Sequence, residues 1–367
     1  MKKIYLITLE SNTGTDRLII DLNEKLIELN YDSSILSPSE IIKDSSLFKL
    51  IKNNVRKIFG WRYISYLIVE LYILFLLLKN KNSSYIVVTF IYPFWTPLIY
   101  FMKMTRRVQY MYQIPDMMWR KQYVTNYRWK LLSIISRIGI INADLILTPT
   151  ASAQIDCITF INKRHHKKIT RLTAPINKKY WEKISSLCVK RLQDKKYIFH
   201  PAGLKITKNT YSAIEAFLNL GIDDVYFVYI KNSSNSNITD FEKIGDRIIA
   251  LCNLSDEEMK WLYKNSLFVS IVSIEEGLGL PVLEAKLFGK TVVVSNASAL
   301  PEAAAHNAIF VDPFSTLSIS EGYREAIRQN NEEICNKNSK IDSKIYGMYQ
   351  DDEIRLIFGE SQIAKDY

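Results

Sequence analysis

The stretch from residue 267 to residue 294 alternates strand-like and helix-like segments, and it constrains the fold more than any other part of the chain. An apolar run at 267–274 leads into a loop with two glycines, a short apolar run that stops at Gly289, and a second strand-like run at 291–294. Pro281 suits the first turn of a helix, where its missing N–H is not needed, and Gly289 suits the residue just past the helix end. This order predicts strand, loop, helix and strand in an α/β fold.

The loop before this helix is a predicted binding site. The first amides of a helix have no intrahelical partner and carry partial positive charge, so they attract an anion. Glu276 and Glu284 frame the loop, and a carboxylate accepts two hydroxyl hydrogen bonds, which fits a sugar or a ribose better than a phosphate. A nucleotide-sugar combines both features, while an ordinary βα loop with two exposed glutamates is an equally weighted alternative. The other donor-binding residues predicted here are Gly277, Leu278, Gly279, Leu280 and Pro281.

The run EGLGLPVLEA at 276–285 resembles the E-x7-E signature of the retaining glycosyltransferases of family 4, which have the two-domain GT-B fold. Stretches at 256–263, 298–302 and 311–313 agree with the same family in order and spacing, and continuous resemblance covers about residues 197–315. In that family the first Glu is thought to contact the donor sugar and the second the ribose. The resemblance carries these roles to Glu276 and Glu284.

The resemblance also implies a diphosphate-binding loop after the strand-like run that ends near residue 200. In the family this loop carries an Arg and, five residues later, a Lys followed by Asn or Gly, and both cations bind the donor diphosphate. Lys208 and Asn209 match the second position. The Arg position falls on Gly203, and Lys205 is the nearest substitute, because its flexible stem can reach a phosphate. Lys208 and Glu276 are therefore the expected catalytic residues, with a solvated loop lysine as the alternative for Lys208.

The chain length of 367 residues suggests two domains. The resemblance implies an α/β GT-B fold with two Rossmann-like domains that face each other across a cleft. An acceptor-binding, membrane-facing domain would span 1–174, with a last parallel strand within 142–149. A nucleotide-sugar-binding domain would span 175–344, and a helix within 345–367 would return to the first domain.

Two residues of the first half are candidates for the acceptor side. Gly14 lies in the first loop, after a strand-like run at 3–9, and this loop faces the cleft in the resembled family. Asp116 follows a strand-like run at 108–114, and open α/β sheets place ligand groups at the carboxyl ends of their strands. A helix N-cap is the alternative role for Asp116.

Positive charge gathers in one part of the first half. Residues 51–130 hold 13 Lys or Arg and two acids, a net charge of +11, against +10 for the whole chain. Their apolar run at 63–78 contains Glu70 and is shorter than the roughly 20 residues that span a bilayer. A buried helix and a helix lying on an anionic membrane surface both remain open. Nucleic acid is not expected as a partner, because no nucleic-acid motif is present.

The remaining sequence features limit the cellular compartment and the chemistry that are expected for this chain. The four cysteines are scattered, which predicts a reducing compartment, and no signal peptide is expected. No metal or other cofactor is expected, and an Asp-x-Asp motif is absent from the sequence. These features predict a cytoplasmic enzyme, peripheral on the inner leaflet of the plasma membrane.

The resemblance implies retaining transfer of a hexosyl group from a nucleotide diphosphate sugar to a glycan or lipid-linked glycan. The expected setting is bacterial-type surface polysaccharide assembly, such as O-antigen (lipopolysaccharide) or capsule. Two other classes stay open. One is a different GT-B enzyme, such as an inverting transferase or a sugar-nucleotide epimerase. The other is a non-catalytic relative that binds a glycan or a membrane partner.

Overall fold

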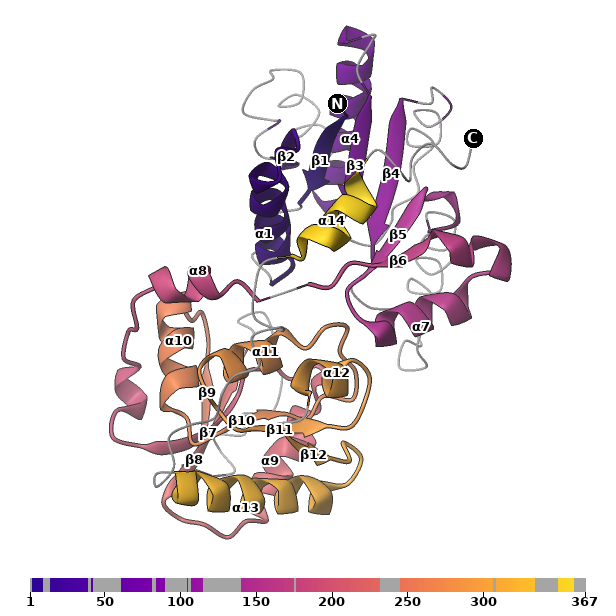
Figure 1. Cartoon of the computed structure of the whole chain (residues 1–367). Coiled ribbons are helices and arrows are strands. Elements are labelled where there is room, and N and C mark those ends of the chain that lie inside the picture. The colour runs from indigo at the N-terminus through magenta and orange to yellow at the C-terminus, as the bar shows by residue number, and fades with distance from the viewer. Residues whose placement is uncertain are drawn as a thin grey trace. The chain divides into compact units, whose positions relative to one another are not determined.

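The computed structural model describes residues 2–8, 14–38, 41, 61–80, 84–89, 104, 107–114, 140–174, 176–231, 245–305, 308–333 and 349–359. The chain divides into two compact units, Met1–Pro175 with Met348–Tyr367, and Ile176–Gly347 (Figure 1). Each unit holds a six-stranded sheet in which all pairs of described strands are parallel. The expected α/β architecture with two Rossmann-like sheets is confirmed.

The sheet of the first unit has the strand order β2-β1-β3-β4-β5-β6. Its strands are β1 (Lys3–Ile7), β2 (Ser33–Leu36), β3 (Tyr85–Thr89), β4 (Val108–Gln113), β5 (Leu145–Thr148) and β6 (Ile169–Arg171). The expectation that 142–149 contains the last strand is wrong, because β6 pairs with β5 beyond it. β6 is short and lies at the sheet edge with only Ile169 buried, so it leaves no apolar run to detect.

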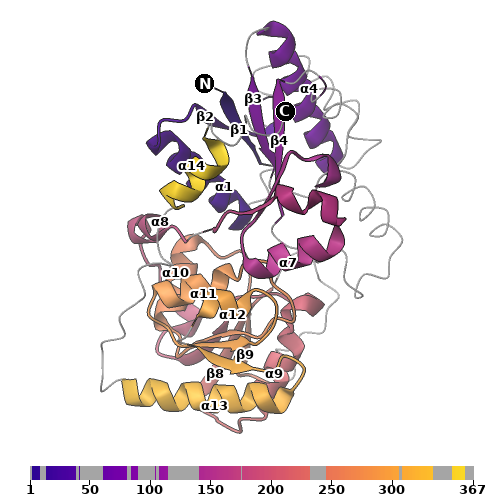
Figure 2. The ribbon, with the colours of Figure 1, turned by 45° about the vertical axis from the view of Figure 1, so that its right-hand side comes forward.

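Helices cover both faces of this sheet (Figure 2). They are α1 (Gly14–Glu28), α4 (Trp61–Lys79), α7 (Ala151–Phe160) and α14 (Asp351–Phe358), with a 3₁₀ segment at Lys163–Lys168. Residues of α1 and α14 share a core with Ile4, Leu6 and Val88 on one face. Residues of α4 and α7 share a core with Tyr5 and Val87 on the other. The alternation along β1 and β3 is what a sheet buried on both sides requires.

The C-terminal helix packs on the first unit, as expected. Ile354 and Phe358 of α14 are buried in the same core as α1. Lys25 of α1 pairs with Asp351 at 2.6 Å, and the Glu353 carboxylate accepts hydrogen bonds from the backbone and hydroxyl of Thr173, both at 3.0 Å. Figure 1 shows α14 beside α1. The return of the chain thus rests on both apolar burial and specific polar contacts.

The second unit has the strand order β12-β11-β10-β7-β8-β9. Its strands are β7 (Lys196–His200), β8 (Val225–Ile230), β9 (Ile248–Leu251), β10 (Val269–Ile271), β11 (Val292–Ser295) and β12 (Ile309–Val311). Its helices are α8 (Lys178–Lys183), α9 (Thr210–Leu218), α10 (Asp256–Asn265), α11 (Leu280–Leu287), α12 (Leu300–Ala304) and α13 (Thr316–Glu333), with 3₁₀ segments at Lys190–Leu192 and Ile206–Lys208. Helices α10, α11 and α12 share one core with the sheet, and α9 and α13 share the other.

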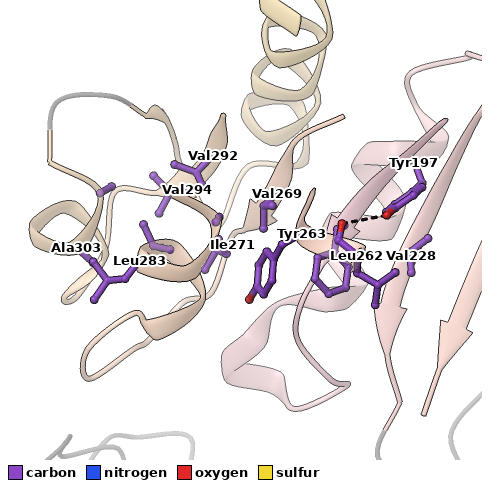
Figure 3. Packing of buried hydrophobic residues seen from close by; sticks show 14 of the residues in the cluster. Tyr197, Val228, Leu262, Tyr263, Val269, Ile271, Leu283, Val292, Val294 and Ala303 are labelled. Carbon is purple, nitrogen blue, oxygen red and sulfur yellow. Dashed lines mark hydrogen bonds between the residues drawn. The ribbon is translucent and has the colours of Figure 1, made fainter. Parts of the chain in front are cut away.

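The strand order of this unit reverses between β7 and β10. From β7 the chain proceeds outward through β8 and β9 on one side, and β10, β11 and β12 lie on the other. Loops at the carboxyl ends of two such strands diverge, and open α/β sheets bind ligands at this point. The loop after β7 (201–209) and the loop after β10 (272–279) therefore define the place to look for a site. Figure 3 shows the core beneath them, including Tyr263, Val269 and Ile271.

Candidate functional site

The start of α11 requires a glycine at residue 279. Gly279 caps the helix with φ 77°, a left-handed conformation that side chains disfavour. A Cβ there would lie 3.1 Å from Ala303 Cβ and 3.2 Å from Leu300 Cδ2, so a side chain would also require α12 to shift by a few tenths of an ångström. Pro281 stands in the first turn, as expected. Gly279 is thus fixed by the turn and by helix packing.

The end of α11 has the glycine that is expected just past the last turn of a helix. Gly289 has φ 68°, its N–H donates to Lys286 O at 2.9 Å, and the N–H of Lys290 donates to Ala285 O at 3.0 Å. This pair of bonds is a Schellman motif, which satisfies the last carbonyls of a helix. Because both ends are fixed by local rules, the position of Glu284 within the helix is well determined.

Glu276 and Lys208, the two residues expected to be catalytic, lie together. The Lys208 ammonium forms an ion pair with Glu276 Oε1, and Ser273 Oγ donates to the same oxygen at 3.1 Å. Both partners are mostly buried, with 26% and 12% of their side chains exposed. The pair joins the loop after β7 to the loop after β10, so a cation and a carboxylate stand at the reversal of the strand order.

The backbone of Glu276 is also held. Ser298 Oγ donates to Glu276 O at 2.7 Å, and it receives a longer bond of 3.4 Å from Glu276 N. Ser298 adopts φ 56°, which is uncommon for a residue with a side chain. Glu276 is therefore held at two places. Lys208 and Ser273 bind one oxygen of its carboxylate, and Ser298 binds its backbone.

Backbone contacts fasten the two loops to each other. Thr207 O accepts from Ile274 N at 2.9 Å, and the Asn209 amide donates to Val272 O at 3.1 Å and to Pro313 O at 2.7 Å. Asn209 has φ 57°, a conformation that Asn tolerates better than most residues. The Asn209 side chain thus holds the loop that carries Lys208, and direct contact of Asn209 with a donor stays a prediction.

His200, at the end of β7, supports the same loop and is not among the residues expected from the sequence. Its ring is fully buried, with Nδ1 2.9 Å from Ser270 O and Nε2 3.1 Å from Thr210 Oγ1. In the neutral ring Nδ1–H donates to Ser270 O, and Nε2 accepts from the Thr210 hydroxyl, whose single proton is shared with Gly203 O at 2.7 Å. Burial, with a smaller contribution from the Lys208 charge, lowers the pKa of His200 to about 4, so the ring is neutral at pH 7.

Gly203 and Lys205 lie in the loop held by His200. The Gly203 carbonyl is linked to His200 through the hydroxyl of Thr210. Lys205 is exposed, and its carbonyl accepts from Lys208 N at 2.9 Å, so both lysines belong to one tight turn. Lys205 therefore has room to reach a ligand at this edge, and its proposed role as a substitute for an Arg stays a prediction.

Glu284 is held by a residue that sequence reasoning missed. The hydroxyl of Tyr263, on α10, donates to Glu284 Oε2 at 2.7 Å. Tyr263 is fully buried, and Glu284 is partly exposed. A tyrosine at an apolar position of a helix gives no local signal of such a role, because the partner comes from a different element.

Most of the other predicted residues lie around the start of α11. Gly277, Leu278, Leu280 and Pro281 are partly exposed around the start of α11. Gly14 is the first residue of α1, and Asp116 lies outside the described residues. Across the described ranges, no group of three or more His, Cys, Asp or Glu side chains gathers in a way that would hold a metal ion.

Comparisons with known proteins find a family match for part of the chain and a shared fold for nearly all of it. Residues 188–342 match the family model described as glycosyl transferases group 1. A search of curated proteins found no match.

Solved structures of similar fold cover nearly the whole chain. Sucrose-phosphate synthase from Thermosynechococcus elongatus aligns with TM-score 0.66 and 12% identity, over 99% of this chain and 98% of its own. A glycosyltransferase from Rickettsia africae aligns with TM-score 0.63 and 15% identity, over 100% and 99%. The Anabaena protein HepE, in complex with UDP and glucose, aligns with TM-score 0.64 and 12% identity, over 99% and 100%. At these identities the likeness establishes the shared fold.

Proposed function

We propose that the chain is a glycosyltransferase of the group 1 family, whose model matches residues 188–342, and that its nucleotide-sugar donor binds between the loops after β7 and β10. The observation that carries the proposal is the Lys208–Glu276 pair at the carboxyl edge of the sheet. The start of α11 contributes partial positive charge beside Glu276. Glu284, which lies on α11 and is held by Tyr263, supplies a second carboxylate.

The proposed chemistry is retaining transfer of a hexosyl group. The bond from the anomeric carbon to the diphosphate breaks and a bond from that carbon to the acceptor oxygen forms on the same face. Negative charge develops on the leaving phosphate, which takes up the proton of the acceptor hydroxyl. Lys208 and the first amides of α11 stabilise that charge, because fixed positive groups need no reorganisation during the reaction. Glu276 accepts hydroxyls of the donor sugar and Glu284 accepts hydroxyls of the ribose. When the donor binds, Lys208 exchanges its contact with Glu276 for the phosphate.

The first donor to try is a uridine nucleotide of glucose. The similar HepE structure is described as a complex with UDP and glucose, and a similar trehalose-6-phosphate enzyme from E. coli is described as bound with UDP-2-fluoro glucose. The acceptor we propose is a glycan or lipid-linked glycan hydroxyl, in assembly of a bacterial-type surface polysaccharide.

Replacement of Glu284 by alanine is expected to weaken donor binding at least about tenfold, because a carboxylate that accepts ribose hydroxyls is lost. Calorimetric titration of UDP-glucose into both proteins measures the effect. Glu302→Gln, on the neighbouring helix α12, is the control and is expected to bind like the wild type. Unchanged affinity in the Glu284 variant would contradict the ribose role.

The exposed apolar side chains of α4 and the positive charge of its segment are consistent with an acceptor that is bound to a membrane. One side of this helix is buried in the core through Ile68, Ile73 and Leu77, whereas Phe75 and Leu78 are 52% and 69% exposed. The helix belongs to the segment 51–130, whose net charge is +11. Within the described residues, no helix has the length and apolar character needed to cross a bilayer. We therefore propose that α4 lies in the core and that its exposed apolar side chains contact an anionic membrane surface.

Binding to vesicles that contain anionic lipid is expected to weaken as salt is added, because screening acts on exposed charges. Leu78→Ser is expected to weaken it further, whereas Leu317→Ser, which changes a similarly exposed leucine of the second unit, is expected to have no effect. Co-sedimentation at low and high salt measures both. Binding that ignores salt, or that responds equally to the two variants, would contradict the proposal.

A further inference from the structure

The hydrogen bond between Tyr263 and Glu284 links a buried aromatic core to the proposed donor site. Tyr263 has no exposed surface, and its ring lies edge-on to Phe199, with centroids 5.1 Å apart and planes at 79°. It also stacks on Phe288 at 5.7 Å and 25°, and meets Trp181 edge-on at 6.5 Å. These neighbours come from β7, from the end of α11 and from α8, so the ring is held from several sides (Figure 3 shows it within the core).

A tyrosine held in this way presents its hydroxyl at a fixed point. The side chain of Glu284 has several rotatable bonds and is partly exposed, so by itself it would sample many orientations. The bond of 2.7 Å to Oε2 selects one of them. An ionised carboxylate has about four acceptor positions, so a carboxylate that accepts from Tyr263 is also able to accept from two hydroxyls of a ligand.

We propose that Tyr263 is a positioning residue that orients the Glu284 carboxylate toward the two ribose hydroxyls of the donor nucleotide. The inference rests on the proposed function, because it assumes that Glu284 binds the ribose. It assigns to the aromatic core beneath α11 a part in discriminating ribonucleotides from nucleotides that lack these hydroxyls. Tyr263 touches no reacting atom, so its effect falls on donor binding and not on the chemical step.

Another buried tyrosine provides a matched control. The hydroxyl of Tyr197 donates to the carbonyl of Leu262 at 3.0 Å, in the same core as Tyr263 but with no site carboxylate as partner. Tyr197→Phe therefore removes one buried hydrogen bond, as Tyr263→Phe does, and leaves Glu284 oriented. A loss common to both variants would report core stability, and a loss confined to Tyr263→Phe would report positioning.

The experiment measures ribose discrimination by calorimetry. The probe is whichever of UDP, GDP and ADP the wild type binds most tightly, together with its 2′,3′-dideoxy analogue. Wild type is expected to prefer the ribonucleotide by about 10- to 100-fold, the effect of hydrogen bonds to a charged group. Tyr263→Phe is expected to reduce that ratio by about five- to tenfold, and Tyr197→Phe to leave it unchanged. With a nucleotide-sugar as donor, Tyr263→Phe should raise KM and leave kcat within about twofold.

Each outcome decides a different point. A wild type that binds no nucleotide would overturn the donor site and this inference with it. A wild type that binds both nucleotides equally would overturn the ribose role of Glu284 and this inference, and would leave the donor site standing. A ratio that collapses in Glu284→Ala but persists in Tyr263→Phe would overturn the role of Tyr263 alone. If Tyr263→Phe does not fold, Glu284→Asp, whose shorter side chain cannot keep the bond to Tyr263, should show the same reduced ratio. An unchanged ratio in that variant would also overturn the proposal.

Discussion

Replacement of Lys208 by alanine is expected to slow sugar transfer at least about 100-fold, the typical effect of losing one group that stabilises charge in the transition state. Lys208 is the cation that the structure places against Glu276, on a loop fastened to the loop after β10. Steady-state turnover with a nucleotide-sugar donor measures the effect, and thermal unfolding checks that the variant is folded.

Lys205→Ala is the comparison variant, because Lys205 lies in the same turn, is exposed and is the predicted substitute for the Arg. It is expected to slow transfer less than Lys208→Ala does, since an exposed charge is screened by solvent. Near-normal turnover in the Lys208 variant together with a large loss in the Lys205 variant would reverse the assignment. It would make Lys205 the cation that takes over from the missing Arg at Gly203.

Replacement of Glu276 by glutamine is expected to change turnover and product binding in opposite directions. Turnover should fall by about 10- to 100-fold, because a charged acceptor for the sugar hydroxyls is lost. The affinity for UDP should rise about threefold or more, because Lys208 is released from its ion pair and no carboxylate repels the diphosphate. Kinetics and calorimetry on the same protein measure the two effects.

Glu302→Gln serves again as the control and should alter neither quantity. A Glu276 variant that binds UDP more weakly than the wild type would contradict the exchange of partners by Lys208. It would mean that the Glu276 carboxylate supports the anion site, for example by holding Lys208 in place. The carboxylate would then not compete with the donor for Lys208.

Local rules explain why much of the fold is predictable from the sequence. The run at 225–230 is β-branched and aromatic, and it coincides with β8. Pro281 and Gly289 mark the two ends of α11, because a proline early in a helix and a glycine after it satisfy terminal backbone groups in any protein. Lys208 and Glu276 follow the neighbouring parallel strands β7 and β10, and they lie near each other because the carboxyl ends of parallel strands are at one edge of the sheet.

The supporting contacts could not be predicted in the same way. His200 ends an apolar strand, Tyr263 lies within an amphipathic helix, and Ser298 lies in the turn between β11 and α12. Each acts through a partner from another element, and only the packed structure brings them together. The strand β6 was missed because an edge strand with one buried residue has no alternating pattern.

The most direct test of the donor site is a titration of the purified protein with UDP-, GDP-, ADP- and dTDP-sugars, observed through ligand NMR signals, with Glu284→Ala in parallel. We predict selective binding to one nucleotide, and loss of that binding in the variant. Absence of binding across the whole panel, from protein shown to be folded, would contradict the assignment of Lys208, Glu276 and Glu284 to a donor site. It would indicate that a chain with Gly203 in place of an Arg cannot hold a diphosphate there.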